Sequence, residues 1–298
     1  MKILVTGVCG QLGHDVIGEI CRRGHTAMGT DLAPQCQDFT TPYICLDITD
    51  KQAVEKAICD NCPDAVIHCA AWTAVDMAED DANVDKVFAV NSQGTKNIAQ
   101  ACKKCGAKML YLSTDYVFSG EGTAPWQPDC KEFAPLNVYG KSKLEGEQAV
   151  SKILDNYFIV RIAWVFGLNG NNFIKTMLRL SENHDQIRVV NDQIGTPTDT
   201  RELARLLVDM VETEKYGYYH ATNEGGYISW YDFAVEIFAQ AGRDTNVIPV
   251  SSSDYGESKA KRPHNSRLDK SKLIKNGFAP LPIWQDALSR YLSELGEK

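Results

Sequence analysis

The strongest constraint on the fold is a regular alternation in the first half of the chain between short apolar segments and longer helical patterns. Strands are expected at residues 2–6, 26–30, 43–46, 65–69, 108–113 and 157–162, and helices at 11–23, 51–59, 85–105 and 138–152. This alternation is typical of repeated βαβ units. Apolar runs such as Ala65-Val66-Ile67 suit strands that helices cover on both faces. The sequence therefore predicts an α/β protein with a doubly wound parallel sheet.

The pattern changes after about residue 165. Helical segments there are separated by loops rich in Pro and Gly at 191–198, 222–226 and 251–265. We expect one domain over residues 1–165 and, over 166–298, a smaller lobe that mainly binds substrate, with some segments returning to the first domain. A cleft between the two parts is the expected ligand site.

A glycine-rich loop follows directly on the first expected strand and opens the first expected helix. Its residues are Gly7, Gly10, Gln11, Leu12 and Gly13. Glycines there permit a tight turn and close approach of a pyrophosphate, which the N–H groups at the helix N-terminus can bind. The spacing is G-x-x-G-x-x-G, and the alternative is a turn that binds nothing.

The next expected strand leads to Asp31, 18 residues after Gly13, where a carboxylate can bind the ribose hydroxyls of a dinucleotide. Further cofactor contacts are expected where the third and fourth strands end, because that edge of an open parallel sheet binds the ligand. These candidates are Asp47, Ile48, Ala70, Ala71, Trp72 and Thr73. The prediction is a Rossmann-like domain that binds NADH or NADPH.

Tyr139 and Lys143 lie four residues apart at the start of an expected helix, so both side chains face one side. An ammonium beside a phenol favours the phenolate and is expected to bring the tyrosine closer to a working pKa for proton transfer. Tyr255 and Lys259 repeat the spacing, but in a loop without a preceding sheet strand. We therefore favour the first pair as catalytic.

The formal charge of −8 argues against nucleic acid as a partner. No apolar run approaches the length of a membrane span or of a signal-peptide core, so a cytoplasmic location is expected. The ten cysteines are expected to be reduced thiols. Cys59/Cys62 and Cys102/Cys105 could be drawn as a zinc site, but the second pair has the spacing of core thiols on a helix.

Taken together, several short motifs resemble the extended short-chain dehydrogenase/reductase family, and within it the reductases of deoxythymidine-diphosphate (dTDP) keto sugars. In the first half these motifs are Val5 to Gly13, Ala70 to Asp76, Ser113 to Phe118 and Pro135 to Lys143. In the second half they are Gly170 to Phe173, Asn191 to Gln193 and Arg262 to Leu268.

The resemblance implies hydride transfer from NADH or NADPH to C4 of dTDP-4-dehydro-L-rhamnose, giving dTDP-L-rhamnose. Tyr139 would donate the proton, Thr114 would hydrogen-bond the carbonyl oxygen, and Lys143 would also hold the cofactor. Asp115 and Trp164 would contact the substrate, and Arg262 could meet its diphosphate, although an Arg-Pro surface turn explains Arg262 as well.

Some relatives are described as metal-linked dimers. Asp15 and Glu294 could match two of their acids, but Arg201 stands where a third is expected, so we predict no metal and leave a homodimer open. Two alternatives remain at this point. One is another enzyme of the family, such as a nucleotide-sugar epimerase, and the other is a non-catalytic regulatory subunit of the methionine adenosyltransferase type.

Overall fold

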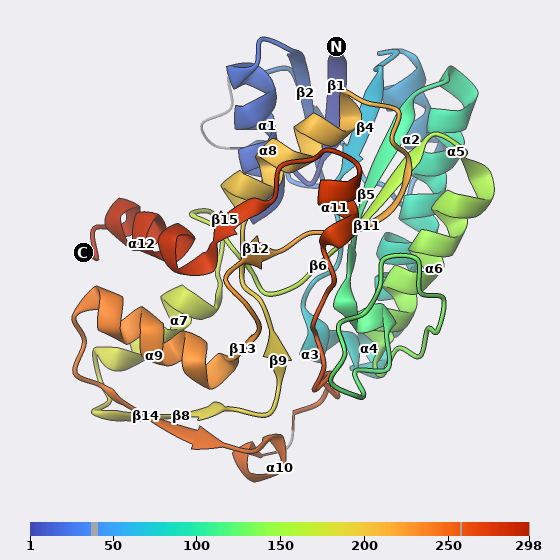
Figure 1. Cartoon of the computed structure of the whole chain (residues 1–298). Helices are drawn as coiled ribbons and strands as arrows, with labels where there is room; N and C mark the ends of the chain where they lie inside the picture. Colours follow the sequence, from blue (N-terminus) through green and yellow to red (C-terminus); the bar gives the residue numbers. More distant parts are fainter. Residues whose placement is uncertain (37–40, 257, 298) are drawn as a thin grey trace.

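The computed structural model describes residues 1–36, 41–256 and 258–297, and its core is a seven-stranded parallel sheet (Figure 1). Its strands in chain order are β1 (Lys2–Thr6), β2 (Thr26–Asp31), β3 (Tyr43–Cys45), β4 (Ala65–His68), β5 (Lys108–Thr114), β6 (Tyr157–Ile162) and β11 (Gly217–His220). The spatial order is β11-β6-β5-β4-β1-β2-β3. The order reverses between β1 and β4, as in Rossmann-like sheets. The predicted fold class is confirmed.

Helices cover both faces of the sheet (Figure 1). On one face lie α1 (Gln11–Arg22) and α8 (Thr200–Val211), and on the other lie α2 (Lys51–Cys59), α5 (Thr95–Cys105) and α6 (Val138–Ile153). Alternate strand residues point to opposite faces, so β1 sends Ile3 and Val5 into one apolar core and Leu4 into the other. This explains why the buried strands show continuous apolar runs.

The helix expected over 85–105 is interrupted. The segment is made of α4 (Asp81–Phe88), a π-helical turn η1 (Ala89–Gly94) and α5. At Gly94, an added Cβ would lie 2.8 Å from the Ile48 side chain. The widened turn therefore accompanies close packing against the segment after β3, and apolar periodicity did not predict it.

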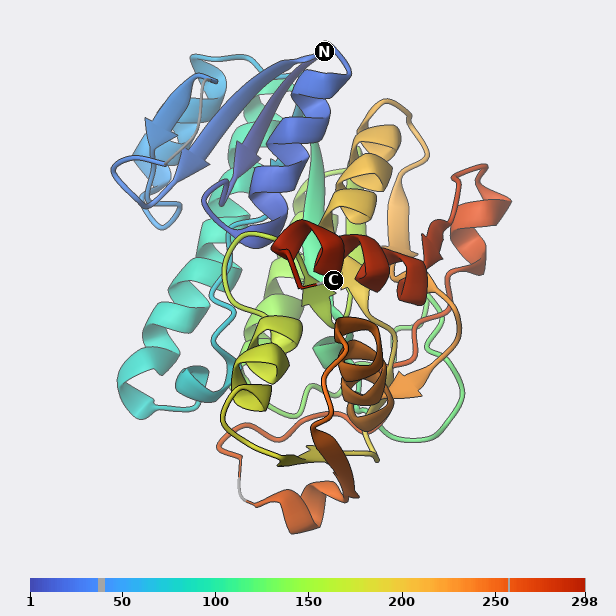
Figure 2. The same cartoon turned by 90° about the vertical axis from the view of Figure 1, so that its left-hand side faces the viewer.

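The second lobe packs its own apolar core between short strands and helices (Figure 2). Its helices are α7 (Phe173–Ser181), α9 (Trp230–Ala241), α10 (Ser252–Tyr255) and α12 (Trp284–Leu295), whereas α11 (Ser271–Lys275) lies against the sheet. Its short strands are β7 (Val165–Phe166), β8 (Gln186–Val190), β9 (Ile194–Gly195), β10 (Thr198–Asp199), β12 (Asn223–Glu224), β13 (Ile228–Ser229), β14 (Asn246–Val250) and β15 (Leu281–Ile283). Two single turns, α3 (Val75–Ala78) and η2 (Asp115–Val117), belong to the first half.

Several segments of the second half lie with the first, and helix α11 is one of them, because its Leu273 belongs to the apolar core beneath the sheet. Strand β11 extends the sheet by pairing with β6, and α8 packs beside α1. A buried ion pair between Arg161 of β6 and Glu147 of α6, with N to O distance 2.7 Å, links this end of the sheet to its helix layer. The division at residue 165 remains a proposal, since the chain crosses between the two parts more than once.

The expectation that all cysteines are reduced is wrong for one pair. Cys9 and Cys36 form a disulfide with Cα atoms 5.7 Å apart. Parallel pairing of β1 with β2 brings the segments that follow them together, although the cysteines are 27 residues apart in sequence. The other cysteines in the described part of the chain are free thiols. Within the described ranges, no helix has both the length and the apolar character needed to cross a membrane.

Candidate active site

A cavity of about 980 Å³ opens at the carboxyl edge of the sheet and reaches into the second lobe. Every residue proposed from the sequence for the site contributes to its lining. Those proposed for the cofactor are Gly7, Gly10, Gln11, Leu12, Gly13, Asp31, Asp47, Ile48, Ala70, Ala71, Trp72, Thr73, Tyr139 and Lys143, and those for the substrate are Thr114, Asp115, Trp164 and Arg262. Tyr255, on α10, does not line this cavity and is 56% exposed.

The glycine loop has the conformation that a phosphate cradle requires. Gly7 has a φ of +73°, and a Cβ there would lie 2.6 Å from the Ala70 nitrogen. A Cβ at Gly13 would lie 2.1 Å from the Gly7 carbonyl oxygen. Gly10 begins α1 without a side-chain cap, so no capping oxygen competes for the N–H groups of the first turn. These residues fit a pyrophosphate at the helix N-terminus.

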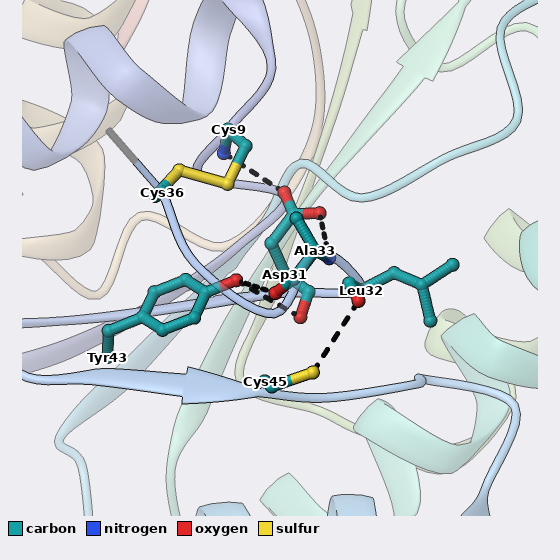
Figure 3. Close-up of a disulfide and its surroundings, with 7 residues drawn as sticks. All are labelled: Cys9, Asp31, Leu32, Ala33, Cys36, Tyr43 and Cys45. Carbon is teal, nitrogen blue, oxygen red and sulfur yellow. Dashed lines mark hydrogen bonds between the residues drawn. A yellow bond between two sulfur atoms is a disulfide. The ribbon is translucent and has the colours of Figure 1, made fainter.

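Asp31 lies at the end of β2, where a cofactor ribose is expected. Its Oδ2 accepts a hydrogen bond of 3.0 Å from the Cys9 N–H, and its Oδ1 accepts one of 3.3 Å from the Ala33 N–H (Figure 3). A carboxylate has lone pairs for further donors, so ribose hydroxyls can still bind. No basic residue occurs from Leu32 to Cys36 to neutralise a 2′-phosphate.

Asn91 supports the fourth strand end and was not identified from the sequence. Its Oδ1 accepts from the Trp72 N–H at 2.8 Å, and its Nδ2 donates to the Trp72 carbonyl at 3.1 Å and to Ser142 Oγ at 3.0 Å. It lies in the π-helical turn η1 and is buried. Asn91 thereby connects the cofactor edge to helix α6. A lone Asn within a helical pattern gives no sequence signal for this role.

Helix α6 positions Tyr139 and Lys143 within its first two turns. The Asn137 side chain caps the helix by accepting from the Gly140 N–H at 2.8 Å. Lys143 is 3% exposed, and its Nζ donates to the Leu112 carbonyl at 2.6 Å and lies 4.2 Å from the centre of the Tyr111 ring. Burial lowers the pKa of Lys143 to about 7, and the Glu147 carboxylate partly opposes that shift.

The expected influence of Lys143 on Tyr139 is not found in this structure. Burial is the main cause that raises the pKa of Tyr139; the Asp115 carboxylate also raises it, and a hydrogen bond with Thr114 lowers it. The Lys143 ammonium is instead directed at the Leu112 carbonyl. A high pKa keeps the phenol protonated at neutral pH, which is the form that a proton donor needs.

Asp115 and Arg262, proposed from the sequence for the substrate, both line the cavity. Burial raises the pKa of Asp115 to about 6, and hydrogen bonds from Ser266 and Thr114 oppose the shift. Arg262 does not have a free guanidinium, because its Nη2 pairs with the Asp76 carboxylate at 2.6 Å. Its proposed contact with a diphosphate would therefore require sharing or replacing that ion pair.

Trp164 forms an aromatic wall together with a residue that the sequence did not indicate. Its ring stacks on Trp230 of α9, with centroids 3.7 Å apart. Trp164 has a φ of +52°, an uncommon conformation for a large side chain. A Cβ on Gly195 would lie 2.8 Å from the indole, so glycine leaves room for the ring. Trp230 is 66 residues further along the chain (230 − 164), and only the tertiary fold brings the two together.

The three residues weighed for a metal lie near one another. Arg201 forms an ion pair with Glu294. Burial lowers the pKa of Arg201, but Glu294, Asp199 and, more weakly, Asp15 raise it, so that the net shift is upward. The Thr200 hydroxyl donates to Asp15 at 2.5 Å. A guanidinium therefore supplies positive charge beside these acids. Across residues 1–36, 41–256 and 258–297, no group of three or more His, Cys, Asp or Glu side chains is arranged to hold a metal ion.

The parallel sheet, the glycine loop at its edge and the Tyr139–Lys143 pair in the same cavity define a Rossmann-like oxidoreductase of the short-chain dehydrogenase/reductase class. The model of the RmlD substrate binding domain family matches residues 1–297, and the chain belongs to this family.

Similar proteins cover nearly the whole chain. The dTDP-4-dehydrorhamnose reductase of Streptomyces griseus is 40% identical over 294 residues, which are 96% of this chain and 91% of that protein. The crystal structure of such a reductase from Clostridium acetobutylicum has a TM-score of 0.91 at 40% identity and covers 99% of this chain and 100% of its own. One from Bacillus anthracis, in complex with NADP, has a TM-score of 0.90 at 38% identity and covers 98% of this chain and 99% of its own.

Proposed function

We propose that this chain catalyses the NAD(P)H-dependent reduction of the C4 keto group of dTDP-4-dehydro-L-rhamnose to give dTDP-L-rhamnose. The observation that carries this proposal is one cavity that joins the glycine loop to Thr114, Tyr139 and Lys143 and continues to the aromatic wall at Trp164. Family membership over residues 1–297 and the reductases among its relatives support the substrate.

Three side chains divide the work at the reacting carbonyl. The protonated Tyr139 phenol donates a proton to the oxygen as negative charge develops on it. The Thr114 hydroxyl, at the end of β5, would hydrogen-bond the same oxygen by turning its proton away from Asp115 Oδ1, to which it donates at 3.0 Å. Lys143 is fixed by Leu112 and keeps donor capacity for a cofactor ribose. The nicotinamide, when bound, supplies the hydride.

Other residues that line the cavity would bind the dinucleotide and the sugar nucleotide. The first turn of α1 would bind the pyrophosphate, and Asp31 would bind the adenosine ribose. Asp115 would accept hydroxyls of the sugar, while Trp164 would form an apolar wall against it. The Asp31 carboxylate repels a 2′-phosphate, so we expect NADH to be used at least as well as NADPH.

The experiment is a spectrophotometric assay of the purified chain with the dTDP keto sugar and each reduced nicotinamide. Loss of the reduced-nicotinamide absorbance, together with formation of dTDP-L-rhamnose by chromatography, is expected. Absence of turnover with this sugar but activity with another nucleotide sugar would favour the epimerase-type alternative. Binding of dinucleotide without turnover of any sugar would favour the regulatory alternative.

The intact set of Thr114, Tyr139 and Lys143 in one cavity favours catalysis over a purely regulatory role, because a scaffold has no need of a proton donor. The absence of nucleic-acid partners and a cytoplasmic location remain predictions, and a homodimer remains open. Gel filtration with light scattering would test for the homodimer.

A further inference from the structure

The Cys9–Cys36 disulfide lies beside Asp31 (Figure 3), and both Cys9 and Asp31 line the cavity where the adenosine ribose would bind. Cys9 is one of the residues between the glycines of the loop, and it is exposed and lines the cavity. Cys36 follows β2 and is partly buried against the core beside α1. The bridge therefore joins the phosphate-binding loop to the segment that follows Asp31, and Cys9 leaves it accessible to a reagent in solution.

The bridge joins two segments whose backbone groups hold one side chain. The Asp31 carboxylate accepts from the Cys9 N–H on one oxygen and from the Ala33 N–H on the other. Both donors belong to segments that the disulfide links. Closing the bridge thus keeps the carboxylate oriented between the loop and the end of β2, where it favours ribose hydroxyls and repels a 2′-phosphate.

Without the bridge, fewer contacts restrain the segment after β2. Tyr43 donates its hydroxyl to the Ala33 carbonyl, and the Cys45 thiol donates to the Leu32 carbonyl at 3.5 Å. These contacts tie the segment to β3 but not to the phosphate loop (Figure 3). The Gly7 N–H still donates to the Thr30 carbonyl, so the loop stays at the end of β2, but within the described residues the Cys9 N–H is then the only hydrogen-bond donor from the loop to the Asp31 carboxylate. With the sulfur atoms of Cys9 and Cys36 no longer linked, that single hydrogen bond can break and the carboxylate can turn away from the position of a 2′-phosphate.

We propose that Cys9 and Cys36 form a thiol–disulfide switch that sets the discrimination between NADH and NADPH. The bridged form disfavours NADPH, and the reduced form accepts it more readily. The proposal rests on the dinucleotide role of this cavity given above.

The chemistry is thiol–disulfide exchange with an external disulfide, either a small molecule or a protein. The thiolate of one cysteine attacks the external disulfide, forms a mixed disulfide and releases one thiolate. The thiolate of the second cysteine then attacks the sulfur of the first cysteine in the mixed disulfide and releases the second external thiolate. Two thiols of the chain are oxidised, the external disulfide is reduced to two thiols, and the two protons pass to them. A dithiol reverses both steps.

The test is binding of each dinucleotide without sugar, so that it does not depend on turnover. The wild-type chain is equilibrated with oxidised glutathione or with dithiothreitol, and mass spectrometry of unreduced peptides establishes whether Cys9 and Cys36 are linked. Dissociation constants for NADH and NADPH are then measured by titration calorimetry. We expect the NADPH-to-NADH ratio of Kd values to fall by at least about fivefold on reduction, the size of an exposed like-charge contact.

Two variants make the result specific. Cys36→Ser cannot form the bridge. In both buffers it is expected to show the Kd ratio of the wild-type protein treated with dithiothreitol. Cys21→Ser removes an exposed free thiol near the end of α1 and is expected to respond as the wild type does. If Cys36→Ser fails to fold, Cys36→Ala replaces it, and the wild-type redox comparison stands by itself.

An unchanged Kd ratio in verified oxidised and reduced protein would overturn the switch, and so would failure to find a Cys9–Cys36 peptide after oxidation. Failure to bind either dinucleotide in either state would instead count against the proposed function.

Discussion

The surroundings of the Tyr139 side chain keep its phenol protonated, which bears directly on its proposed role as proton donor. Its raised pKa suits proton donation to a ketone and is opposite to the shift expected from the Tyr–Lys spacing. The difference arises because a sequence shows which residues share a helix face but not how the ammonium is directed. In the fold, the Leu112 carbonyl at the end of the neighbouring strand receives it.

Replacing Tyr139 with Phe removes the proton donor and leaves the ring. We expect kcat to fall by at least about a hundredfold, as for loss of a general acid, while the Kd of NADH stays nearly unchanged. Steady-state kinetics and calorimetry measure the two. Tyr255→Phe is the matched control and should keep wild-type activity, because Tyr255 is exposed and does not line the cavity. Retained turnover in Tyr139→Phe would move the role to another residue.

Asp115 is expected to give the reaction an acid limb. Burial raises the pKa of Asp115 to about 6. Below that pH the carboxyl group is neutral and accepts hydrogen bonds from the sugar hydroxyls less well. For wild type, kcat/KM should fall about tenfold per pH unit below this value, as for a single essential ionisation. Asp115→Asn should be slower and lack this limb. Burial lowers the pKa of Lys143 to about 7, so any change in kcat/KM caused by loss of its charge above that pH should occur in Asp115→Asn as well. An acid limb unchanged by Asp115→Asn would contradict the assignment.

The sequence pattern predicted secondary-structure elements correctly where the residues that define an element are neighbours in the chain. Strand β1, the glycine loop and helix α1 follow one another as the sequence indicates, because turn, cap and periodicity involve neighbouring residues. The π-helical turn between α4 and α5 was missed, and it lies where Gly94 packs closely against Ile48, a residue distant in sequence that apolar periodicity does not reveal.

Two glycines of helix α1 offer a matched pair. Gly13→Ala would place a Cβ against the Gly7 carbonyl and is expected to cost about 1–3 kcal/mol of unfolding free energy, as overpacking does, and to abolish NADH binding. Gly18→Ala meets no atom within 4 Å and should stabilise the chain by about 0.5–1 kcal/mol. Urea unfolding and NADH titration measure both. Equal stability of the two variants would show that the loop adjusts to a Cβ.

Across the whole molecule, the two halves of the sequence are held together by contacts of long sequence separation. Strand β11 completes the sheet beside β6, and the Arg161 guanidinium, 1% exposed, is held by Glu147 of α6 and by the Pro128 carbonyl. Such a network specifies how the end of the sheet meets its helix layer.

Glu147→Gln should show the importance of this network. It leaves the Arg161 charge buried without its partner, so a loss of about 3–5 kcal/mol is expected in urea unfolding. Lys56→Gln is the control, because it breaks an exposed ion pair with Asp60 and should leave the free energy of unfolding nearly unchanged. A loss for Glu147→Gln as small as that of the control would mean that Arg161 finds another partner or reaches solvent.

The assembly of the molecule is expected not to depend on a divalent metal. Arg201 lies against Glu294 and near Asp15. Its guanidinium supplies the positive charge that a divalent cation would otherwise supply beside these acids. Treatment with a chelator should therefore change neither the mass measured by light scattering nor the activity. A clear shift in mass after chelation would contradict this prediction.

The sequence by itself determined the alternation of strands and helices, the glycine loop with Asp31, and the pairing of Tyr139 with Lys143 on one helix face. Each of these depends on residues close together in the chain. Only the tertiary structure decided that Trp230 stacks on Trp164, that Asn91 supports Trp72, and that Arg262 is already paired with Asp76. It also decided that Cys9 meets Cys36, because parallel strands bring distant loops to one edge of the sheet.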